Sequence, residues 1–158
     1  SLNLILFCSG IAIVLDFLME KRFYFDTSVW LDFFENRDEP NLPKGAWARK
    51  LISKIISKND RILYSDLTII ELEEGGYSRY ELDSLIMPLR KILIFLEATD
   101  KQIGISKDLS LKRKIPRKDA LHALIARDSR AVLVTLDHHF KQITDIIVSY
   151  RTNELLRP

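Results

Sequence analysis

The segment DALHALIARDSRAVLVTLD, residues 119–137, decides the fold class. Its first part, Asp119 to Arg127, is rich in Ala and Leu and predicts a helix. Its second part, Ala131 to Thr135, is a β-branched apolar run and predicts a buried strand that ends at Leu136 and Asp137. A helix that leads directly into an apolar strand is typical of an α/β domain with a largely parallel sheet.

The same alternation of short apolar runs and longer helical patterns extends over the chain from Arg22 onward. Strands are predicted at 23–25, 61–65, 131–135 and 146–148, and residues 92–98 fit either a strand or a helix. Helices are predicted from residue 28, where Thr27 or Ser28 serves as N-cap, and at 46–58, 67–74, 78–91 with an interruption at Pro88, 101–114 and 119–127. Residues 35–45 carry two prolines and several charges and are predicted to be a loop.

Composition excludes several classes of protein. The chain has 158 residues, enough for one domain, and 47% of them are hydrophobic while 29% are charged, so a disordered, collagen-like or disulfide-rich protein is excluded. The formal charge of +2 is too small to imply a polyanionic partner by itself. Because Cys8 is the only cysteine, no intramolecular disulfide and no cysteine-rich zinc site can form, which suits a reducing cytoplasm.

Residues 1–18 form an apolar segment in front of the domain, which we expect to span residues 19–158. The segment lacks the basic residues that precede the hydrophobic region of a secretory signal, and it is short beside the ~20 residues of a membrane span. A buried or partner-facing helix is therefore expected, and no membrane association. Two alternatives stay open: translation that starts at Met19, and a tethered enzyme whose domain faces the cytoplasm because Lys21 and Arg22 follow the segment.

Four acidic residues lie where an α/β sheet forms its ligand site. Asp26 follows the first predicted strand, Glu71 lies in the helix after the second, Asp119 begins the helix before the clearest strand, and Asp137 follows that strand. Ligands of open α/β sheets bind outside the carboxyl ends of the parallel strands. We therefore expect the four carboxylates to converge on one rim of the sheet.

Such a cluster predicts a divalent cation, because neighbouring carboxylates repel one another unless a positive charge compensates them. Mg²⁺ and Mn²⁺ prefer carboxylate and water oxygens. One or two such ions can activate a water and neutralise charge on a scissile phosphate. The acids alone therefore suffice for phosphodiester hydrolysis, with no catalytic histidine.

Each acid also has a structural interpretation. Asp26 can cap a helix, Glu71 has solvated acidic neighbours, Asp119 suits the positive end of a helix dipole, and Asp137 suits a turn. We favour metal binding for all four.

The three histidines receive structural interpretations. His122, three residues after Asp119, is expected to be a partly buried, hydrogen-bonded histidine, with orientation of Asp119 or contact with RNA as alternatives. His138 and His139 are interpreted as loop residues, because adjacent histidines without further His or Cys ligands are a weak zinc pattern.

The densest basic run leads directly into Asp119. A solvated helix end accounts for these charges, but beside a metal rim they would hold phosphates. We predict substrate contacts at Lys114, Arg117 and Lys118.

Four motifs in sequence order resemble the PIN domain family between Arg22 and about Phe140. They are Phe25-Asp26-Thr27-Ser28, Ile70-Glu71-Leu72, the segment PRKDALHALIA at 116–126 and the segment LVTLDHHF at 133–140. The resemblance implies a Rossmann-like, three-layer α/β/α sandwich with a mostly parallel central sheet. It further implies a metal-dependent ribonuclease, and in particular the VapC-like toxin of a VapBC toxin-antitoxin module.

The resemblance also assigns roles to individual residues. It makes Asp26, Glu71, Asp119 and Asp137 the catalytic, metal-binding acids, with Ser28 and Thr135 as supporting hydroxyls. It implies a small antitoxin partner and a homodimer. The expected function is therefore a cytoplasmic endoribonuclease that uses Mg²⁺ or Mn²⁺. The apolar residues 1–18 and the long 35–45 segment depart from the pattern of a compact toxin.

Two other functions compete with this interpretation. A PIN-fold protein that binds RNA or acts as a scaffold without catalysis would keep the fold and lose the metal. A receiver-like signalling domain also clusters acids at strand ends, but it needs a lysine after a later strand, where this chain has Arg151.

Overall fold

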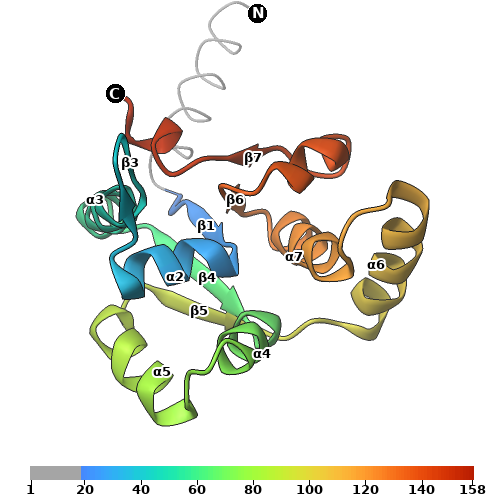
Figure 1. The fold of residues 1–158 in the computed structure, drawn as a ribbon, viewed down its shortest axis with the longest axis horizontal. Helices are drawn as coiled ribbons and strands as arrows, with labels where there is room; N and C mark the ends of the chain where they lie inside the picture. Colours follow the sequence, from blue (N-terminus) through green and yellow to red (C-terminus); the bar gives the residue numbers. More distant parts are fainter. Residues whose placement is uncertain (1–18) are drawn as a thin grey trace, which may run out of the picture.

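In residues 19–158, the part of the chain that the computed structural model describes, short parallel strands form a central sheet (Figure 1). The strand order is β5-β4-β1-β6-β7, and every neighbouring pair is parallel. The bounds are β1 (Arg22–Phe25), β4 (Arg61–Ser65), β5 (Leu93–Leu96), β6 (Val132–Val134) and β7 (Ser149–Tyr150). The predicted parallel sheet is confirmed, and 92–98 contains a strand. The predictions for residues 1–18 lie outside the described residues.

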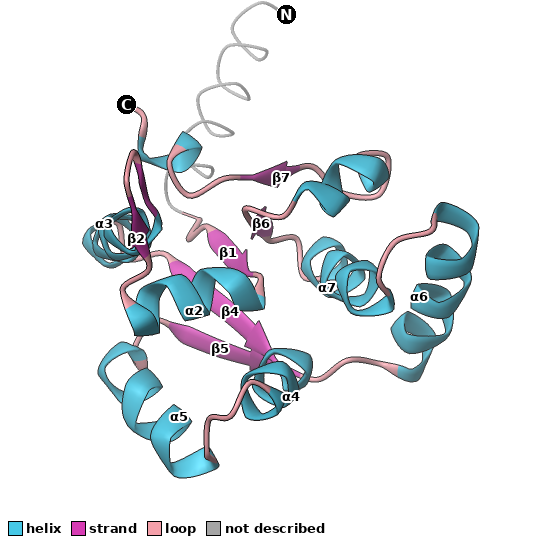
Figure 2. Cartoon of the chain, viewed as in Figure 1, coloured by secondary structure: helices cyan, strands magenta, loops and turns pink. Residues whose placement is uncertain are grey.

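Helices cover both faces of this sheet (Figure 2). They are α2 (Thr27–Glu35), α3 (Lys44–Ser57), α4 (Asp66–Glu74), α5 (Arg79–Ile86), α6 (Asp100–Arg113) and α7 (Arg117–Asp128), with 3₁₀ turns η1 (Met87–Leu89), η2 (His138–Ile143) and η3 (Glu154–Leu156). Ser65, Ser78 and Thr99 accept hydrogen bonds as N-caps of α4, α5 and α6. Pro88 lies in η1, where the helix predicted for 78–91 ends.

Side chains alternate between two cores along each strand. Phe23 and Phe25 pack with α2 and α3 on one face, whereas Tyr24 packs with α7 on the other. In β4, Ile62 and Leu63 divide between the faces in the same way. This alternation is what a strand covered on both faces requires. The chain is therefore the expected three-layer α/β/α sandwich.

The order in which successive strands join the sheet reverses at β1. The chain runs from β1 outward through β4 to β5, then returns to place β6 and β7 on the other side of β1. The amide of Asp26 donates to the carbonyl of Val134 over 3.0 Å, which ties the carboxyl ends of β1 and β6 together. Ligand sites of open α/β sheets form at such a switch point.

The prediction of a strand at 146–148 is wrong. The amides of Ile146 and Ile147 both donate to the carbonyl of Ile143, over 2.9 and 3.1 Å, so these residues form a turn whose side chains pack on the α7 face. The strand follows at Ser149 and Tyr150, which pair with β6. Its residues are partly or fully exposed at the sheet edge, so no apolar run marks it.

The loop predicted at 35–45 is only partly correct. It contains a short antiparallel pair, β2 (Asp38–Glu39) with β3 (Leu42–Pro43). Asn41 between them has a positive φ of 62°, a conformation that Asn tolerates in tight turns. Within residues 19–158, no helix combines the length and apolar character that crossing a membrane requires.

Candidate metal centre

Asp26 lies at the end of β1 with its carboxylate held by two hydroxyls. Its Oδ2 accepts hydrogen bonds from Ser28 Oγ over 2.8 Å and from Thr135 Oγ1 over 2.9 Å. Asp26 is also the N-cap residue of α2, which corrects the predicted caps Thr27 and Ser28, but its side chain accepts no bond from the helix amides. The residue is 7% exposed, so its carboxylate is directed into the site rather than to bulk water.

Glu71 points inward from α4, unlike its acidic neighbours. Its Oε2 accepts hydrogen bonds from the Thr27 hydroxyl and from His122 Nε2, the latter over 2.6 Å. Glu73 forms an ion pair with Arg79, and Glu74 one with Lys118, both outside the site. The solvated interpretation therefore applies to Glu73 and Glu74 but not to Glu71.

His122 lies completely buried beneath Glu71 and Asp26. Its Nδ1 is 2.7 Å from the Tyr24 hydroxyl, which also contacts Ser65 Oγ at 2.7 Å, and its Nε2 is 3.8 Å from Asp26 Oδ1. The expected hydrogen-bonded histidine is confirmed, but burial is complete, and the hydrogen-bonded carboxylate is that of Glu71 rather than Asp119. A lone histidine among the apolar residues of the α7 helix was the available sequence signal.

Burial alone lowers the pKa of His122, but the Tyr24 oxygen, the hydrogen bond to Glu71 and the charge of Asp26 outweigh it and raise the pKa to about 10. Burial likewise acts to raise the pKa of Glu71, whereas the hydrogen bond and charge of His122 lower it overall. Both directions favour an imidazolium paired with a carboxylate.

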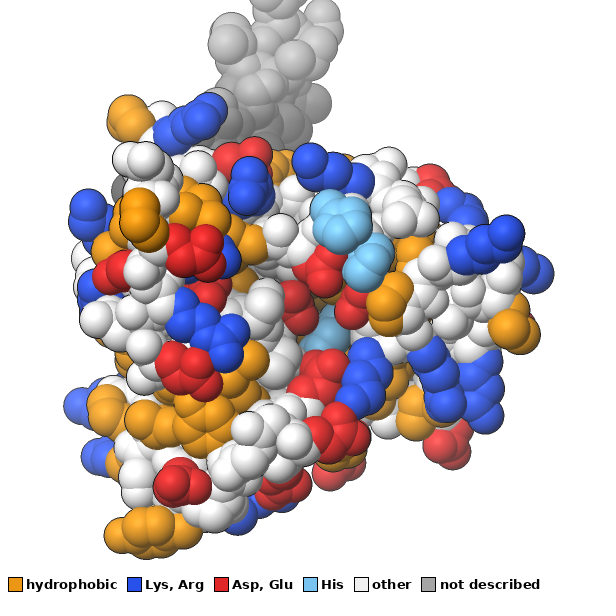
Figure 3. Space-filling view, viewed as in Figure 1, with side chains coloured by type: hydrophobic (Ala, Val, Ile, Leu, Met, Phe, Trp, Pro, Cys, Tyr) orange, Lys and Arg blue, Asp and Glu red, His pale blue; other side chains and the backbone are white. Residues whose placement is uncertain are grey.

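Asp119 and Asp137 both contact the imidazole of His139. His139 Nδ1 is 3.1 Å from Asp119 Oδ2 and 3.2 Å from Asp137 Oδ1. Asp137 is the N-cap of η2, where its Oδ1 accepts the amide of His139 over 2.9 Å. Acidic and histidine side chains gather around a hollow in the middle of the face shown in Figure 3. His138 and His139, interpreted as loop residues, are therefore part of a 3₁₀ turn, and His139 contacts two of the four predicted acids.

The carboxylates share one electrostatic environment. Burial, followed by the negative charges of Asp26 and Asp137, raises the pKa of Asp119 from 3.8 to about 6. Thr135 joins the two halves of the cluster, because its Oγ1 donates to Asp26 and accepts the amide of Asp137 over 3.0 Å. The structure thus brings all four predicted acids to the carboxyl edge of β1 and β6.

The donor set fits a hard divalent cation. Among the described residues, none donates a hydrogen bond to Asp26 Oδ1, Asp119 Oδ1 or Asp137 Oδ2. Each of these oxygens therefore keeps lone pairs that a cation can use. Carboxylate oxygens of this kind suit Mg²⁺ and Mn²⁺, and a bound ion would offset the repulsion that raises the pKa of Asp119.

The predicted substrate-binding cations are exposed beside this cluster. Arg117 and Lys118 begin α7, and Lys114 is the left-handed C-cap of α6. The Lys118 ammonium forms an ion pair with Glu74, so its charge is already partly matched. Lys114 and Arg117 have no ion pair among residues 19–158.

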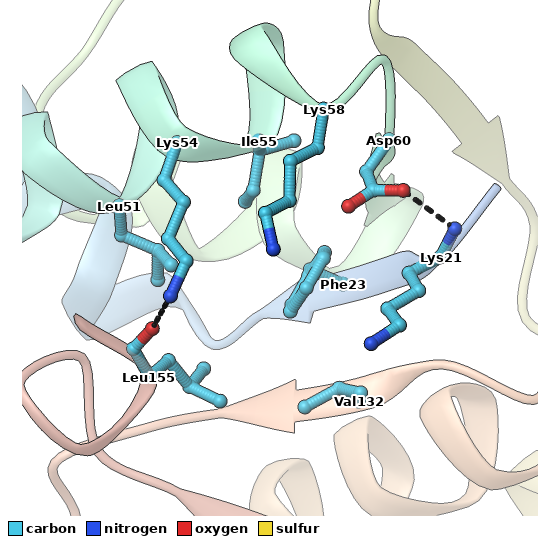
Figure 4. A pocket seen from close by; sticks show the side chains of 9 residues that line it. All are labelled: Lys21, Phe23, Leu51, Lys54, Ile55, Lys58, Asp60, Val132 and Leu155. Atoms are coloured by element: carbon cyan, nitrogen blue, oxygen red, sulfur yellow. Dashed lines mark hydrogen bonds between the residues drawn. The ribbon is translucent and has the colours of Figure 1, made fainter. Parts of the chain in front are cut away.

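A separate cavity of ≈ 170 Å³ lies at the opposite, amino end of the sheet (Figure 4). Its apolar wall includes Phe23 and Val132, and Lys54 closes one side by donating to the Leu155 carbonyl over 2.8 Å. None of the four acids lines it. We therefore do not assign this cavity to the metal centre.

Comparison with known proteins identifies one family. The model of the PIN domain matches residues 23–146. No curated protein matches in sequence.

Solved structures that share the fold include the following three. VapBC2 from Rickettsia felis, bound to a DNA fragment from its promoter, has a TM-score of 0.60 and 19% identity over 82% of this chain and 98% of that chain. A toxin-antitoxin complex from Klebsiella pneumoniae has a TM-score of 0.59 and 19% identity over the same shares. A protein from Pyrobaculum aerophilum has a TM-score of 0.54 and 20% identity over 87% of this chain and 96% of that chain.

Proposed function

This chain belongs to the PIN domain family, and from that premise we propose that it is a metal-dependent endoribonuclease, the VapC-like toxin of a toxin-antitoxin pair. The observation that carries the proposal is the convergence of four carboxylates at the switch point between β1 and β6, where burial, Asp26 and Asp137 raise the pKa of Asp119 to about 6. Carboxylates held this close repel one another, and a cation that binds them offsets the repulsion.

The chain's own residues would hold the cation and the substrate. Asp26, Asp119 and Asp137 present lone pairs, while Ser28 and Thr135 keep the other oxygen of Asp26 engaged. Glu71 is restrained by Thr27 and His122 and faces the same rim. When bound, Mg²⁺ or Mn²⁺ supplies activation of a water and neutralisation of charge on the phosphate.

Exposed cations beside the acids would orient RNA. Lys114 and Arg117 can contact phosphates that flank the scissile bond, and Lys118 can do so in exchange for its pairing with Glu74. Because such contacts release counterions, RNA binding should weaken as salt rises.

The decisive experiment is cleavage of a structured RNA pool by the purified chain with Mn²⁺, Mg²⁺ or EDTA. Asp119→Asn should abolish cleavage, because it removes a negative charge from the metal rim. Asp108→Asn is the matched control, since Asp108 is an exposed acid on α6, and it should cleave as the unmodified chain does.

Metal-dependent cleavage that Asp119→Asn abolishes supports the nuclease. Cleavage that survives in EDTA, or equally in Asp119→Asn, contradicts it. RNA binding with no cleavage under any metal supports the non-catalytic alternative.

We also propose that the chain forms a cytoplasmic homodimer whose acidic rim is covered by a small antitoxin. Support for the antitoxin partner comes from the Klebsiella pneumoniae neighbour, which is a toxin-antitoxin complex, and from the Rickettsia felis VapBC2. Light scattering behind size exclusion should give twice the chain mass of 18.4 kDa. A single-chain mass at micromolar concentration contradicts the dimer.

A further inference from the structure

The cavity at the amino end of the sheet combines an apolar wall with ammonium groups, and the function proposed above does not use it. Strands β1 and β6, helix α3 and the turn η3 all contribute side chains to its wall (Figure 4). Its apolar lining residues belong to a single core cluster and are Phe23, Leu51, Ile55, Val132 and Leu155. The cavity is therefore continuous with the packed interior between the sheet and α3.

The size of the cavity limits what it can hold. Its volume of ≈ 170 Å³ is close to that of an engineered apolar cavity of about 150 Å³ that binds benzene. Phe23, Leu51 and Ile55 are at most 9% exposed, so the inner wall consists of core side chains. Transfer of an apolar group from water to such a wall is favourable by about 25 cal/mol per Å². An apolar body of about six carbon atoms therefore suits this space.

The charged residues of the wall leave an excess of positive charge. Three lysines and one aspartate line the cavity, so two net positive charges remain. Lys54 donates to the carbonyl of Leu155 over 2.8 Å and lies 3.5 Å from that of Arg157, so this ammonium is engaged by the backbone. Asp60 is buried, and its Oδ1 accepts the amide of Lys21 over 2.8 Å. Its carboxylate offsets the charge of one lysine.

Lys58 supplies the remaining positive charge. Among residues 19–158, the lysine ion pairs are those of Lys44 and Lys118, so Lys58 has none. Figure 4 shows its side chain directed from the end of α3 into the cavity. The backbone of Lys58 is exposed at the helix end, where a ligand can enter from solvent. One uncompensated ammonium beside an apolar wall is complementary to a single negative charge on an apolar body.

We propose that this cavity binds a small carboxylate with an apolar body of about six carbon atoms. The body packs against Phe23 and Val132, and the carboxylate accepts hydrogen bonds from the Lys58 ammonium. Phe23 and Val132 each lie three residues before a member of the acidic cluster, Asp26 and Thr135, so the ligand occupies the other end of the same two strands. The inference does not depend on the proposed nuclease.

The test compares three small probes on the unmodified chain. Benzoate has a ring of the size of benzene and one carboxylate, benzamide is its neutral counterpart of nearly the same shape, and acetate carries the charge without the ring. Each is titrated into the ¹⁵N-labelled full chain in EDTA at constant ionic strength, and the amide shifts are followed by nuclear magnetic resonance.

Two variants test the position of the charge. Lys58→Gln removes the ammonium but keeps a polar side chain. Lys50→Gln is the matched control, because Lys50 is an exposed lysine on the same helix, α3, and does not line the cavity.

We expect saturable shifts with benzoate at the amides of Phe23, Lys58 and Val132, and little change at the acidic rim. Benzamide and acetate should each bind at least about fivefold more weakly than benzoate, because each lacks one of the two contacts. Lys58→Gln should weaken benzoate binding about fivefold, which is the size of an exposed charge contact. Lys50→Gln should bind benzoate as the unmodified chain does.

Shifts that rise with benzoate without saturating, or that lie outside the cavity, overturn the inference. Equal affinity for benzoate and benzamide, or for benzoate and acetate, also overturns it. The same holds if Lys58→Gln and Lys50→Gln weaken binding equally. Because the three probes are compared on the unmodified chain, the test holds even where Lys58→Gln does not fold.

Discussion

Replacing His122 by leucine tests whether the buried imidazole holds the floor of the site. His122→Leu removes the hydrogen bond to the Glu71 carboxylate and that to the Tyr24 hydroxyl, of 2.6 and 2.7 Å. A bond to a charged group contributes about 1.5–3 kcal/mol and a neutral one about 0.5–1.5 kcal/mol. In the variant, Glu71 keeps its hydrogen bond from Thr27, and Tyr24 keeps its hydrogen bond with Ser65. We therefore expect the free energy of unfolding to fall by about 2–4 kcal/mol.

The loss should depend on pH in a defined direction. Because the folded-state pKa of His122 is raised from 6.5 to about 10, its contribution is complete below pH 6.5 and disappears as pH rises through about 10. Urea unfolding in EDTA at pH 6, 8 and 10 should therefore show a difference between the unmodified chain and His122→Leu that narrows with pH. His138→Leu, at an exposed histidine, should change stability by less than about 0.5 kcal/mol. Two results would refute the reasoning: equal stability of His122→Leu and the unmodified chain at pH 6, or a difference in unfolding free energy between them that is as large at pH 10 as at pH 6.

Three further outcomes are expected. The affinity for Mn²⁺ should fall about tenfold per pH unit below about pH 6, because Asp119 must lose its proton to bind the ion, and calorimetry at pH 5, 6 and 7 measures this. Thr135→Val should lower the unfolding free energy by about 1.5–3 kcal/mol in urea, since Asp26 loses a hydroxyl donor, and a change below 0.5 kcal/mol would contradict that bond. Leu82→Ala should cost about 2–5 kcal/mol by thermal melting, because Leu82 is fully buried, whereas Tyr80→Ala on the exposed side of α5 should cost little.

The architecture followed from local patterns. Apolar runs at 61–65 and 131–135 are strands because their side chains are buried on both faces, and hydrophobicity in sequence records that burial directly. The strand at Ser149 and Tyr150 was missed for the same reason, since an edge strand with exposed side chains has no apolar signature. Ile146 and Ile147 are apolar because their side chains pack against the core on the α7 face of the sheet, and not because they pair with another strand.

The four acids could be selected from the sequence because Asp26 and Asp137 follow predicted strands, Asp119 begins a predicted helix and Glu71 lies in the helix after a predicted strand. The carboxyl ends of parallel strands meet at one rim. Asp26 directly follows β1 and Asp137 lies three residues after the end of β6, so both are near the sheet edge once the strands pair. Whether they bind a metal stays a prediction.

The partners of these acids depend on contacts between distant segments. Thr135 and Asp26 are 109 residues apart, and His122 and Glu71 are 51 apart, so no local pattern links them. The placement of α7 relative to α4 decides that His122 reaches Glu71 rather than Asp119, and the turn after β6 decides that His139 contacts both Asp119 and Asp137. The sequence alone determined the layers and which acids meet, because both follow from the order and burial of strands. The tertiary structure alone decided which side chains orient those acids, because that depends on the relative placement of helices that are joined only through the sheet.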